Sequence, residues 1–277
     1  MQAVTILASV ERLRSQAADG AVRALREIRE RPLLTLSLLL VLSTAIFLIV
    51  PGLDLAFSRQ FFQGDAGFVE ARKPVPQALR EFSGYVTVAV IAACLAGLLA
   101  PAIAGWRRFG LKPSDALYVL TVYVVGPGLV VNGLFKNLFG RARPREIVEF
   151  GGADQFTSIW TIMGDCTSNC SFVSGEGSSA AALLTLALIT PRDYRMAALA
   201  GLGSYAFVIS LNRIAFGGHF LSDVVIAWIL VLIFAIAIRP LFTGERGLAI
   251  DEAVSGARRY LEARRTMPRA GAAQTES

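Results

Sequence analysis

Six hydrophobic runs of near-spanning length limit the folds open to this chain. In lipid, every backbone polar group must be hydrogen-bonded within the protein, so only helices and closed barrels cross a bilayer. Runs of this length and composition are typical of transmembrane helices. They cover residues 34–50, 85–103, 116–135, 177–190, 196–211 and 220–238. With 54% of its residues hydrophobic, the sequence predicts an all-α fold, a six-span transmembrane helical bundle. The fourth run is the shortest, because Pro191 ends it.

The placement of arginine and lysine predicts which way the bundle faces. Basic residues concentrate in the cytoplasmic segments of membrane proteins. In this chain basic residues occur in four segments, which lie before the first span and after the second, fourth and sixth spans. These basic segments are 12–31, 107–112, 192–195 and 239–269. We therefore expect a protein of the cell's inner membrane, with residues 52–84, 136–173 and 212–219 on the periplasmic side.

The spans divide the chain into one membrane domain and two cytoplasmic segments. We expect an N-terminal segment at 1–32, the membrane domain at 33–240 and a tail at 241–277. Apolar residues at helical spacing in 5–31 and 248–262 predict amphipathic helices at the membrane surface. The net charge of +6 fits arginines that meet anionic lipid headgroups, and it does not argue for nucleic acid as a partner.

Three polar clusters at the predicted periplasmic ends of the spans carry the functional signal. Ionisable groups near a bilayer are costly, so each cluster needs a reason. Basic side chains follow the third span, a Ser-Gly-Glu sequence opens the fourth, and a lone histidine precedes an aspartate by four residues. The residues are Lys136, Arg141 and Arg143; Ser174, Gly175 and Glu176; and Arg213, His219 and Asp223.

Together these clusters meet the chemical needs of a phosphate site. Lysine and arginine neutralise phosphoryl oxygens, and arginine does so in a bidentate manner. Backbone amides at the helix start of Ser174 and Gly175 donate to the same anion, and glycine allows close approach. His219 shares a helix face with Asp223, which can orient its ring and leave one nitrogen free to attack phosphorus. A lipid anchor or a helix cap explains each cluster alone, but their convergence favours catalysis.

These motifs resemble the three signatures of the type 2 phosphatidic acid phosphatase superfamily, which also includes vanadium haloperoxidases. The signatures here are Lys136-x6-Arg143-Pro144, Ser174-Gly175 and Arg213-x5-His219-x3-Asp223. The resemblance implies that His219 attacks phosphorus to form a phosphohistidine, while Asp223 orients the ring. It implies further that water hydrolyses this intermediate and that no metal or other cofactor takes part. The phosphate-binding residues implied are Lys136, Arg143, Ser174, Gly175 and Arg213.

The second motif departs from the family at one position. Most members have Pro-Ser-Gly-His, whose histidine is the general acid, whereas this chain has Val173-Ser174-Gly175-Glu176. Glu176 can be a catalytic acid only if it is protonated, which burial favours and neighbouring cations oppose. Three roles stay open for it: proton donor, group that orients water, or partner of an arginine. A lipid diphosphate or an anomeric sugar phosphate has a good leaving group and needs little acid help.

Two of the three cysteines, Cys166 and Cys170, lie in the loop expected on the periplasmic side. An oxidising compartment favours a disulfide between them, and two free thiols are the alternative. A zinc site is less consistent with the sequence, because the only other good soft ligand is His219.

The function expected from these features is an integral-membrane phosphatase that acts on a lipid phosphate or diphosphate. Lipid A and undecaprenyl diphosphate are the favoured substrates, with phosphatidylglycerol phosphate and phosphatidic acid as further candidates. The nearest alternative is a phosphotransferase that passes the phosphoryl group to a lipid or sugar acceptor, and no residue separates the two. An anion-binding transporter is a further alternative, disfavoured because the sequence shows no internal duplication.

Overall fold

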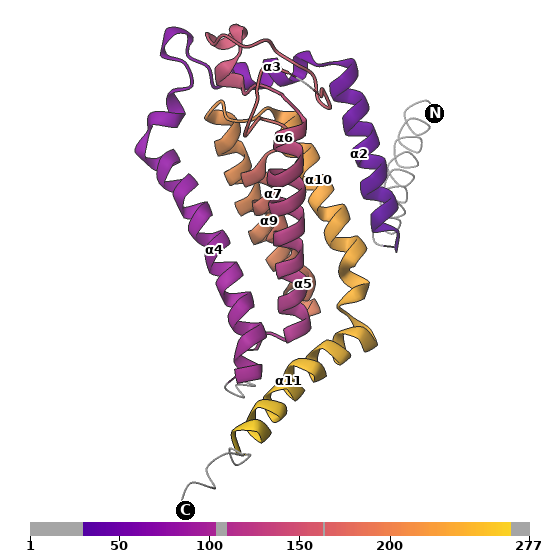
Figure 1. The fold of residues 1–277 in the computed structure, drawn as a ribbon. Helices are drawn as coiled ribbons and strands as arrows, with labels where there is room; N and C mark the ends of the chain where they lie inside the picture. The colour runs from indigo at the N-terminus through magenta and orange to yellow at the C-terminus, as the bar shows by residue number, and fades with distance from the viewer. Residues whose placement is uncertain (1–29, 104–109, 163, 267–277) are drawn as a thin grey trace, which may run out of the picture.

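The computed structural model describes residues 30–103, 110–162 and 164–266, and within them the chain is helical, with no strand (Figure 1). The amphipathic helix expected at 5–31 lies almost wholly outside these residues. The main helices are α2 Pro32–Ile49, α3 Gly52–Arg59, α4 Pro74–Ile103, α5 Pro113–Tyr123, the π-helix η3 Val124–Phe135, α6 Lys136–Leu138, α7 Gly175–Ala182, α8 Leu184–Ile189, α9 Arg192–Ala215, α10 Leu221–Ile238 and α11 Gly244–Thr266. Short 3-10 turns occupy Gly64–Ala66, Val69–Arg72, Pro144–Glu146, Val148–Phe150 and Arg239–Leu241.

Five of the helices are long and apolar enough to cross a membrane, so the protein is an integral membrane protein. These candidate spans are Pro32–Ile49, Pro74–Ala100, Pro113–Leu138, Arg192–Ala215 and Leu221–Leu241. They agree with the sequence-based spans except for the fourth, which is the shorter apolar stretch Gly175–Ile189. At 1.5 Å per residue that stretch is roughly 22 Å long, less than the ~30 Å hydrocarbon core of a bilayer. Six full-length spans are therefore not present in the described residues.

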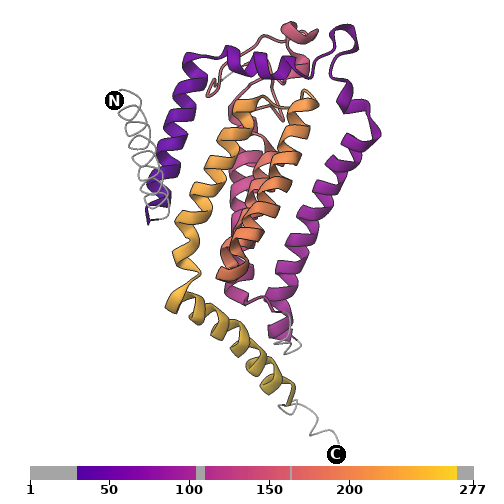
Figure 2. The same cartoon turned by 180° about the vertical axis from the view of Figure 1, so that it is seen from behind.

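The short helix α7 is at the centre of the bundle, where it packs against α9, α10 and η3 (Figure 2). Its sequence consists of Gly, Ser and Ala apart from Glu176, and residues 180–182 are almost fully buried. Small side chains let neighbouring helix backbones approach closely. The helix is enclosed by protein rather than lipid, so it needs neither the length nor the hydrophobicity of a span.

The third span changes from α-helix to π-helix halfway along its length. Pro127 lies inside η3, and proline supplies no N–H for the helical ladder and crowds the preceding turn. The Asn132 side chain donates to the Pro127 carbonyl at 2.7 Å, which fixes the asparagine on this helix. The widened segment ends at Lys136, so it determines where the first polar cluster begins.

Helix α3 and the loops between η3 and α7 close one end of the bundle, and α11 lies at the other end (Figure 1). An aromatic cluster of Phe135, Phe139, Trp160 and Phe172 packs under these loops, with ring centroids 4.8–6.3 Å apart. Two loop segments cross at Gly140 and Gly164, where a Cβ on either residue would overlap the backbone of the other. Only glycine permits so close a crossing.

Candidate active site

The three polar clusters come together at the end of the bundle that α3 covers. Lys136 follows η3, Ser174 caps α7, Arg213 is in the last turn of α9, and Asp223 is in the first turn of α10. The amide of Ser174 donates to the Asp223 carbonyl at 3.1 Å, which joins the second cluster to the third. Helix ends distant in sequence therefore assemble one site.

His219 is a buried imidazole with one nitrogen already engaged. Its Nδ1 atom lies 2.8 Å from the Ser171 carbonyl oxygen, and a carbonyl can only accept, so Nδ1 carries the proton. The other nitrogen, Nε2, is then left with its lone pair. Burial lowers the pKa of His219 to about 4, although Asp223 opposes this shift. The ring is therefore neutral and nucleophilic at neutral pH.

Asp223 is held beside the histidine by several donors. Its Oδ2 atom accepts from the Ser171 hydroxyl at 2.6 Å and from the Phe220 amide at 2.8 Å. The same oxygen is 3.7 Å from His219 Nδ1, beyond normal hydrogen-bond length. The sequence suggested that Asp223 itself binds the ring N–H. In the structure the Ser171 carbonyl does so, and the carboxylate supplies a negative charge alongside.

A buried ion network supports Asp223 from behind. Arg141, only 1% exposed, donates to Asp223 Oδ1 at 2.6 Å and to Asp54 Oδ2 at 2.8 Å. Asp54 in turn accepts from the amide and hydroxyl of Ser222 at 2.9 and 2.6 Å. The Arg141 guanidinium also lies 4.2 Å from the centre of the Phe220 ring. The sequence analysis placed Arg141 only in a basic cluster and did not single out Asp54.

Lys136 and Arg143 are bridged by one residue that sequence reasoning missed. Asn169 accepts from Lys136 Nζ through its side chain at 3.2 Å, and from Arg143 Nη2 through its carbonyl at 2.7 Å. Its backbone has a φ of 50°, a left-handed conformation that asparagine tolerates better than most residues. The disulfide between Cys166 and Cys170 encloses this residue. Two polar oxygens of Asn169 therefore occupy donors of the cations expected to bind phosphate.

Glu176 is held between two arginines. Its Oε2 atom lies 2.7 Å from Arg213 Nε, and its Oε1 atom accepts from Arg80 Nε at 3.1 Å. Guanidinium groups are donors only, so a protonated Glu176 would offer its O–H to no acceptor on either side. Of the roles left open by the sequence, pairing with arginine is the one this geometry provides. Arg80 belongs to α4, outside all three motifs.

The start of α7 offers backbone donors next to these cations. The Ser174 hydroxyl accepts from the Gly177 amide at 3.0 Å, and the Ser174 amide is already bound to Asp223, contrary to the expectation that it faces an anion. The amides of Gly175 and Glu176 have no acceptor in the described part of the chain. A Cβ on Gly175 would lie 2.6 Å from Asn132 Oδ1 and 3.1 Å from Lys136 Nζ. Glycine therefore keeps this space open.

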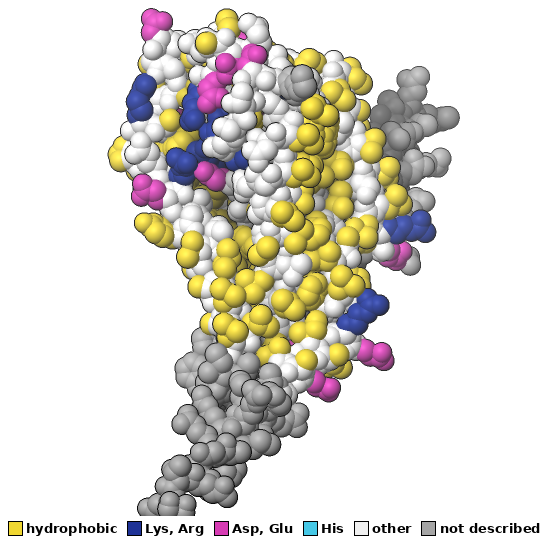
Figure 3. Space-filling model, viewed as in Figure 1, with side chains coloured by type: hydrophobic (Ala, Val, Ile, Leu, Met, Phe, Trp, Pro, Cys, Tyr) yellow, Lys and Arg dark blue, Asp and Glu magenta, His cyan; other side chains and the backbone are white. Residues whose placement is uncertain are grey.

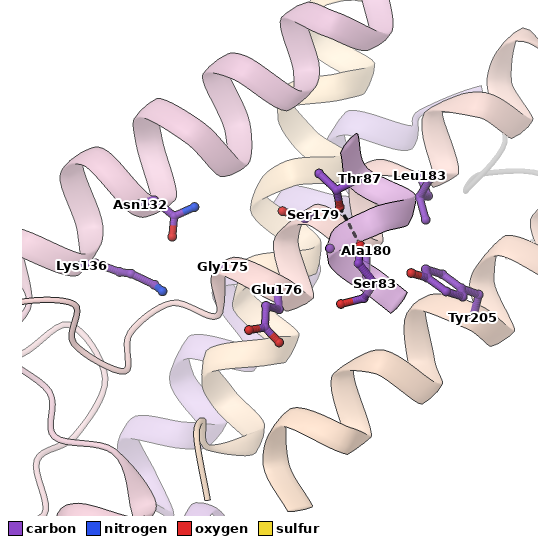
Figure 4. Close-up of a pocket in the computed structure, with 11 residues that line it drawn as sticks. Ser83, Thr87, Asn132, Lys136, Gly175, Glu176, Ser179, Ala180, Leu183 and Tyr205 are labelled. Carbon is purple, nitrogen blue, oxygen red and sulfur yellow. Dashed lines mark hydrogen bonds between the residues drawn. The ribbon is translucent and has the colours of Figure 1, made fainter. Parts of the chain in front are cut away.

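A cavity of about 320 Å³ opens beside Lys136 and Glu176 (Figure 4). A second cavity of about 470 Å³, lined by Arg80 and Arg145, adjoins it at Glu176. Basic and acidic side chains gather around this hollowed end, while hydrophobic side chains cover the middle of the same face (Figure 3). No cluster of three or more His, Cys, Asp or Glu side chains suited to a metal ion occurs in the described residues.

Comparison with known proteins identifies the family. The sequence pattern of the PAP2 superfamily matches residues 115–246. A lipid A 4'-phosphatase of Rhizobium leguminosarum is 33% identical over 211 residues, which cover 71% of this chain and 90% of the relative. A lipid A 4'-phosphatase of Francisella tularensis subsp. novicida is 32% identical over 194 residues, covering 68% and 85%.

Among solved structures, a PAP2-type phosphatidylglycerolphosphate phosphatase from Bacillus subtilis shares 21% identity and a TM-score of 0.47, and the match covers 76% of this chain and 94% of that one. The sequence relatives match along most of their length, and residues 115–246, which match the family pattern, contain all three polar clusters. The chain therefore belongs to the PAP2 superfamily, the type 2 phosphatidic acid phosphatases, and is a membrane enzyme that hydrolyses a lipid phosphate.

Proposed function

We propose that this enzyme removes a phosphate from lipid A or a closely related envelope lipid through a phosphohistidine intermediate. The observation that carries the mechanism is the buried His219, whose Nδ1 is bound to the Ser171 carbonyl and whose Nε2 has no hydrogen-bond partner among the described residues. The names of the relatives from Rhizobium and Francisella support lipid A as the substrate. Undecaprenyl diphosphate is the second candidate substrate.

In the first step, Nε2 of His219 attacks phosphorus and the bond between phosphorus and the lipid oxygen breaks. Lys136, Arg143 and Arg213 neutralise the phosphoryl oxygens as charge spreads over them. The ring becomes positively charged when Nε2 is phosphorylated. The proton stays on Nδ1, which donates it to the Ser171 carbonyl, and the Asp223 carboxylate at 3.7 Å stabilises the cation.

In the second step, a water attacks the phosphohistidine, inorganic phosphate leaves, and Nε2 recovers its lone pair. The lipid oxygen released in the first step takes its proton from solvent, because Glu176 is paired with Arg80 and Arg213. The carboxylate of Glu176 holds these two guanidinium groups in the site.

We place the enzyme in the inner membrane with this site on the periplasmic side. The arginine distribution supports that orientation. The disulfide between Cys166 and Cys170 lies at the same end as the site, and such bonds persist in oxidising compartments.

The deciding experiment is phosphate release by the purified protein in detergent, beside a His219→Ala variant. Lipid A, undecaprenyl diphosphate and phosphatidic acid would be offered in parallel, with vanadate and EDTA as separate additions. We expect release from lipid A that needs His219, is inhibited by vanadate and resists EDTA. Release that persists in His219→Ala contradicts the mechanism. Release only when a second lipid or sugar is added indicates a phosphotransferase instead.

A further inference from the structure

The cavity beside Lys136 continues from the phosphate-binding end down between helices, and the proposed mechanism does not use its lower part. Its walls come from α4, η3, α7 and α9 (Figure 4). Gly84 of α4 and Ala180 of α7 are small, and they leave the space open. The polar side chains that line it, here called the polar groove, are Ser83, Thr87, Asn132, Ser179 and Tyr205.

The polar groove extends into the membrane-spanning part of the protein. Along α7 its lining runs from Gly175 to Ala180 and continues to Leu183, just after the helix, and along α4 it includes Thr87. Seven residues of helix correspond to about 10 Å. Thr87 belongs to the candidate span Pro74–Ala100. Thr87 is seven residues beyond Arg80 on α4, so the groove places a hydroxyl about 10 Å along the helix from that arginine.

Three groups in the groove are free to accept hydrogen bonds. The Ser83 hydroxyl donates to the Arg80 carbonyl at 2.7 Å, and the Thr87 hydroxyl donates to the Ser83 carbonyl at 3.1 Å. A hydroxyl that donates once still has lone pairs for a second partner. Asn132 donates through its nitrogen to Pro127, which leaves its oxygen as an acceptor. The donors of these three side chains are thus bound to helix backbone carbonyls, and their oxygen atoms can accept hydrogen bonds from a ligand in the groove.

Two further hydroxyls can donate. Ser179 of α7 and Tyr205 of α9 have no hydrogen-bond partner among the residues the structure describes. The Tyr205 hydroxyl points from α9 toward Ser83 of α4 across the groove (Figure 4). Polar side chains at membrane depth are costly unless a partner satisfies them, and they commonly mark functional sites. Here donors and acceptors from four different helices face a single space.

We propose that the polar groove is a binding subsite for the part of the lipid next to the phosphate, and that it selects hydroxyl, amide and ester groups. This inference rests on the proposed function, because the same lipid must occupy both places. A phosphorylated sugar with amide- and ester-linked acyl chains carries such groups over the length of the groove. A polyprenyl chain is hydrocarbon from its first carbon and offers no partner to these side chains.

The test measures lipid binding in the full chain carrying His219→Ala, so that no substrate is consumed. Thr87→Val, Ser179→Ala and Tyr205→Phe each remove one hydroxyl at nearly constant shape, and they are combined in a triple variant. The probes are lipid A and undecaprenyl phosphate in detergent. Thr121→Val is the matched control, because its hydroxyl donates to its own helix at Leu117 and lies outside the groove.

We expect the triple variant to bind lipid A about tenfold to a hundredfold more weakly, since each net hydrogen bond contributes about a factor of ten at most. Its affinity for undecaprenyl phosphate should stay within about twofold, which also shows that the variant is folded. Thr121→Val should change neither affinity. Unchanged lipid A binding, an equal loss for both lipids, or no preference for lipid A in the parent protein would each overturn the subsite.

The outcome is separable from that of the proposed function. Phosphate release that requires His219, with lipid A affinity indifferent to the three hydroxyls, would retain the function and remove the subsite. Selective lipid A binding without any phosphate release would retain the subsite and remove the proposed function.

Discussion

Glu176 stands where the second motif that the sequence resembles has a histidine, and its neighbours restrict what a carboxylate can do there. It accepts a hydrogen bond from Arg80 Nε at 3.1 Å and forms an ion pair with Arg213 at 2.7 Å, so its negative charge offsets cations that a phosphoryl group would otherwise use. A bound phosphate must therefore share these arginines with Glu176 or displace it. On this view Glu176 weakens the binding of anions in the resting enzyme and keeps the arginines in place.

Glu176→Gln should strengthen vanadate inhibition by about tenfold while most of the phosphate release is kept. The amide preserves the size of the side chain but removes one negative charge next to Arg213, and a tenfold change corresponds to ~1.4 kcal/mol. The measurement is the inhibition constant of vanadate. Glu81→Gln is the control, since Glu81 lines the neighbouring cavity without contacting Arg213. Loss of turnover with unchanged inhibition would instead make Glu176 the proton donor.

The single histidine allows its protonation to be measured directly. Histidine-labelled protein gives one imidazole signal by NMR, because His219 is the only histidine in the chain. Burial disfavours the charged ring and lowers the pKa to about 4, so we expect a titration midpoint well below 6.5. The unfolded chain binds this proton near 6.5, so the free energy of unfolding should fall as pH drops from 6.5 toward 4. A midpoint at or above 6.5 would mean that Asp223 outweighs burial.

At the residue scale, the sequence predicted which side chains meet but not which atoms bind. The motifs gave Lys136, Arg143, Arg213 and His219 because their chemistry and spacing are distinctive. Two of these groups are bound to backbone carbonyls, His219 to that of Ser171 and Arg143 to that of Asn169. Every residue has a carbonyl, so no pattern of side chains could indicate which ones would be used.

At the scale of elements, α3 connects the start of the membrane domain to the catalytic pair. It contributes Asp54, which binds Arg141 and Ser222, and these in turn contact or adjoin Asp223. Asp54 and Arg141 are 87 positions apart in the chain. Hydropathy places α3 just after a span, but only the folded arrangement shows that its aspartate is 1% exposed and paired.

Asp54→Asn should both destabilise the protein and slow turnover. Breaking a buried ion pair typically costs about 3–5 kcal/mol, because the remaining charge is left without full compensation. Of its two carboxylate partners Arg141 would then keep only Asp223, and the position of Asp223 beside His219 would change. Thermal unfolding in detergent and kcat/KM are the readouts, with the exposed Asp65→Asn as the matched control. An unfolding temperature equal to that of Asp65→Asn would contradict this role for α3.

The disulfide loop is a second element that acts on the site. Cys166 and Cys170 enclose Asn169, which positions Lys136 and Arg143. Opening the disulfide gives the loop more conformations, so we expect a reductant to lower kcat/KM severalfold. The double variant Cys166→Ser/Cys170→Ser should have the same kcat/KM as the reduced enzyme, and reductant should not change it. Removal of the buried free thiol by Cys94→Ser should leave the response intact; equal activity of oxidised and reduced enzyme would contradict it.

At the scale of the whole molecule, hydropathy predicted the long spans and overestimated the fourth. Each of the five long helices has less than half of its most apolar stretch buried by protein, so these sequences must be apolar where they meet lipid and are easy to detect. The α7–α8 stretch is enclosed by other helices, and its Gly, Ser and Ala residues reflect packing rather than solvation by lipid. A sequence window measures hydrophobicity alone and cannot separate these two causes.

The site end and α11 lie at opposite ends of the molecule (Figure 1), which makes the proposed orientation testable. Cysteine would be introduced at Asp65, next to α3, or at Ser255 in α11, in a Cys94→Ser background. We expect a membrane-impermeant maleimide to label the Asp65→Cys variant in the periplasm of cells whose inner membrane is intact. Labelling of Ser255→Cys should need disruption of that membrane. The opposite pattern would reverse the orientation.

The crossing of Gly140 and Gly164 has a consequence for how this protein tolerates change. Neither residue belongs to the candidate site, yet the two backbones lie so close that a single added methyl group has no room. This contact fixes the position of the loop that leads to Arg143 relative to the loop that carries Asn169. In a random mutant library screened for inactive protein, alanine at either glycine would be recovered together with substitutions of His219. The glycine variants would be inactive because the two loops cannot pack, whereas the His219 variants lack the reacting group.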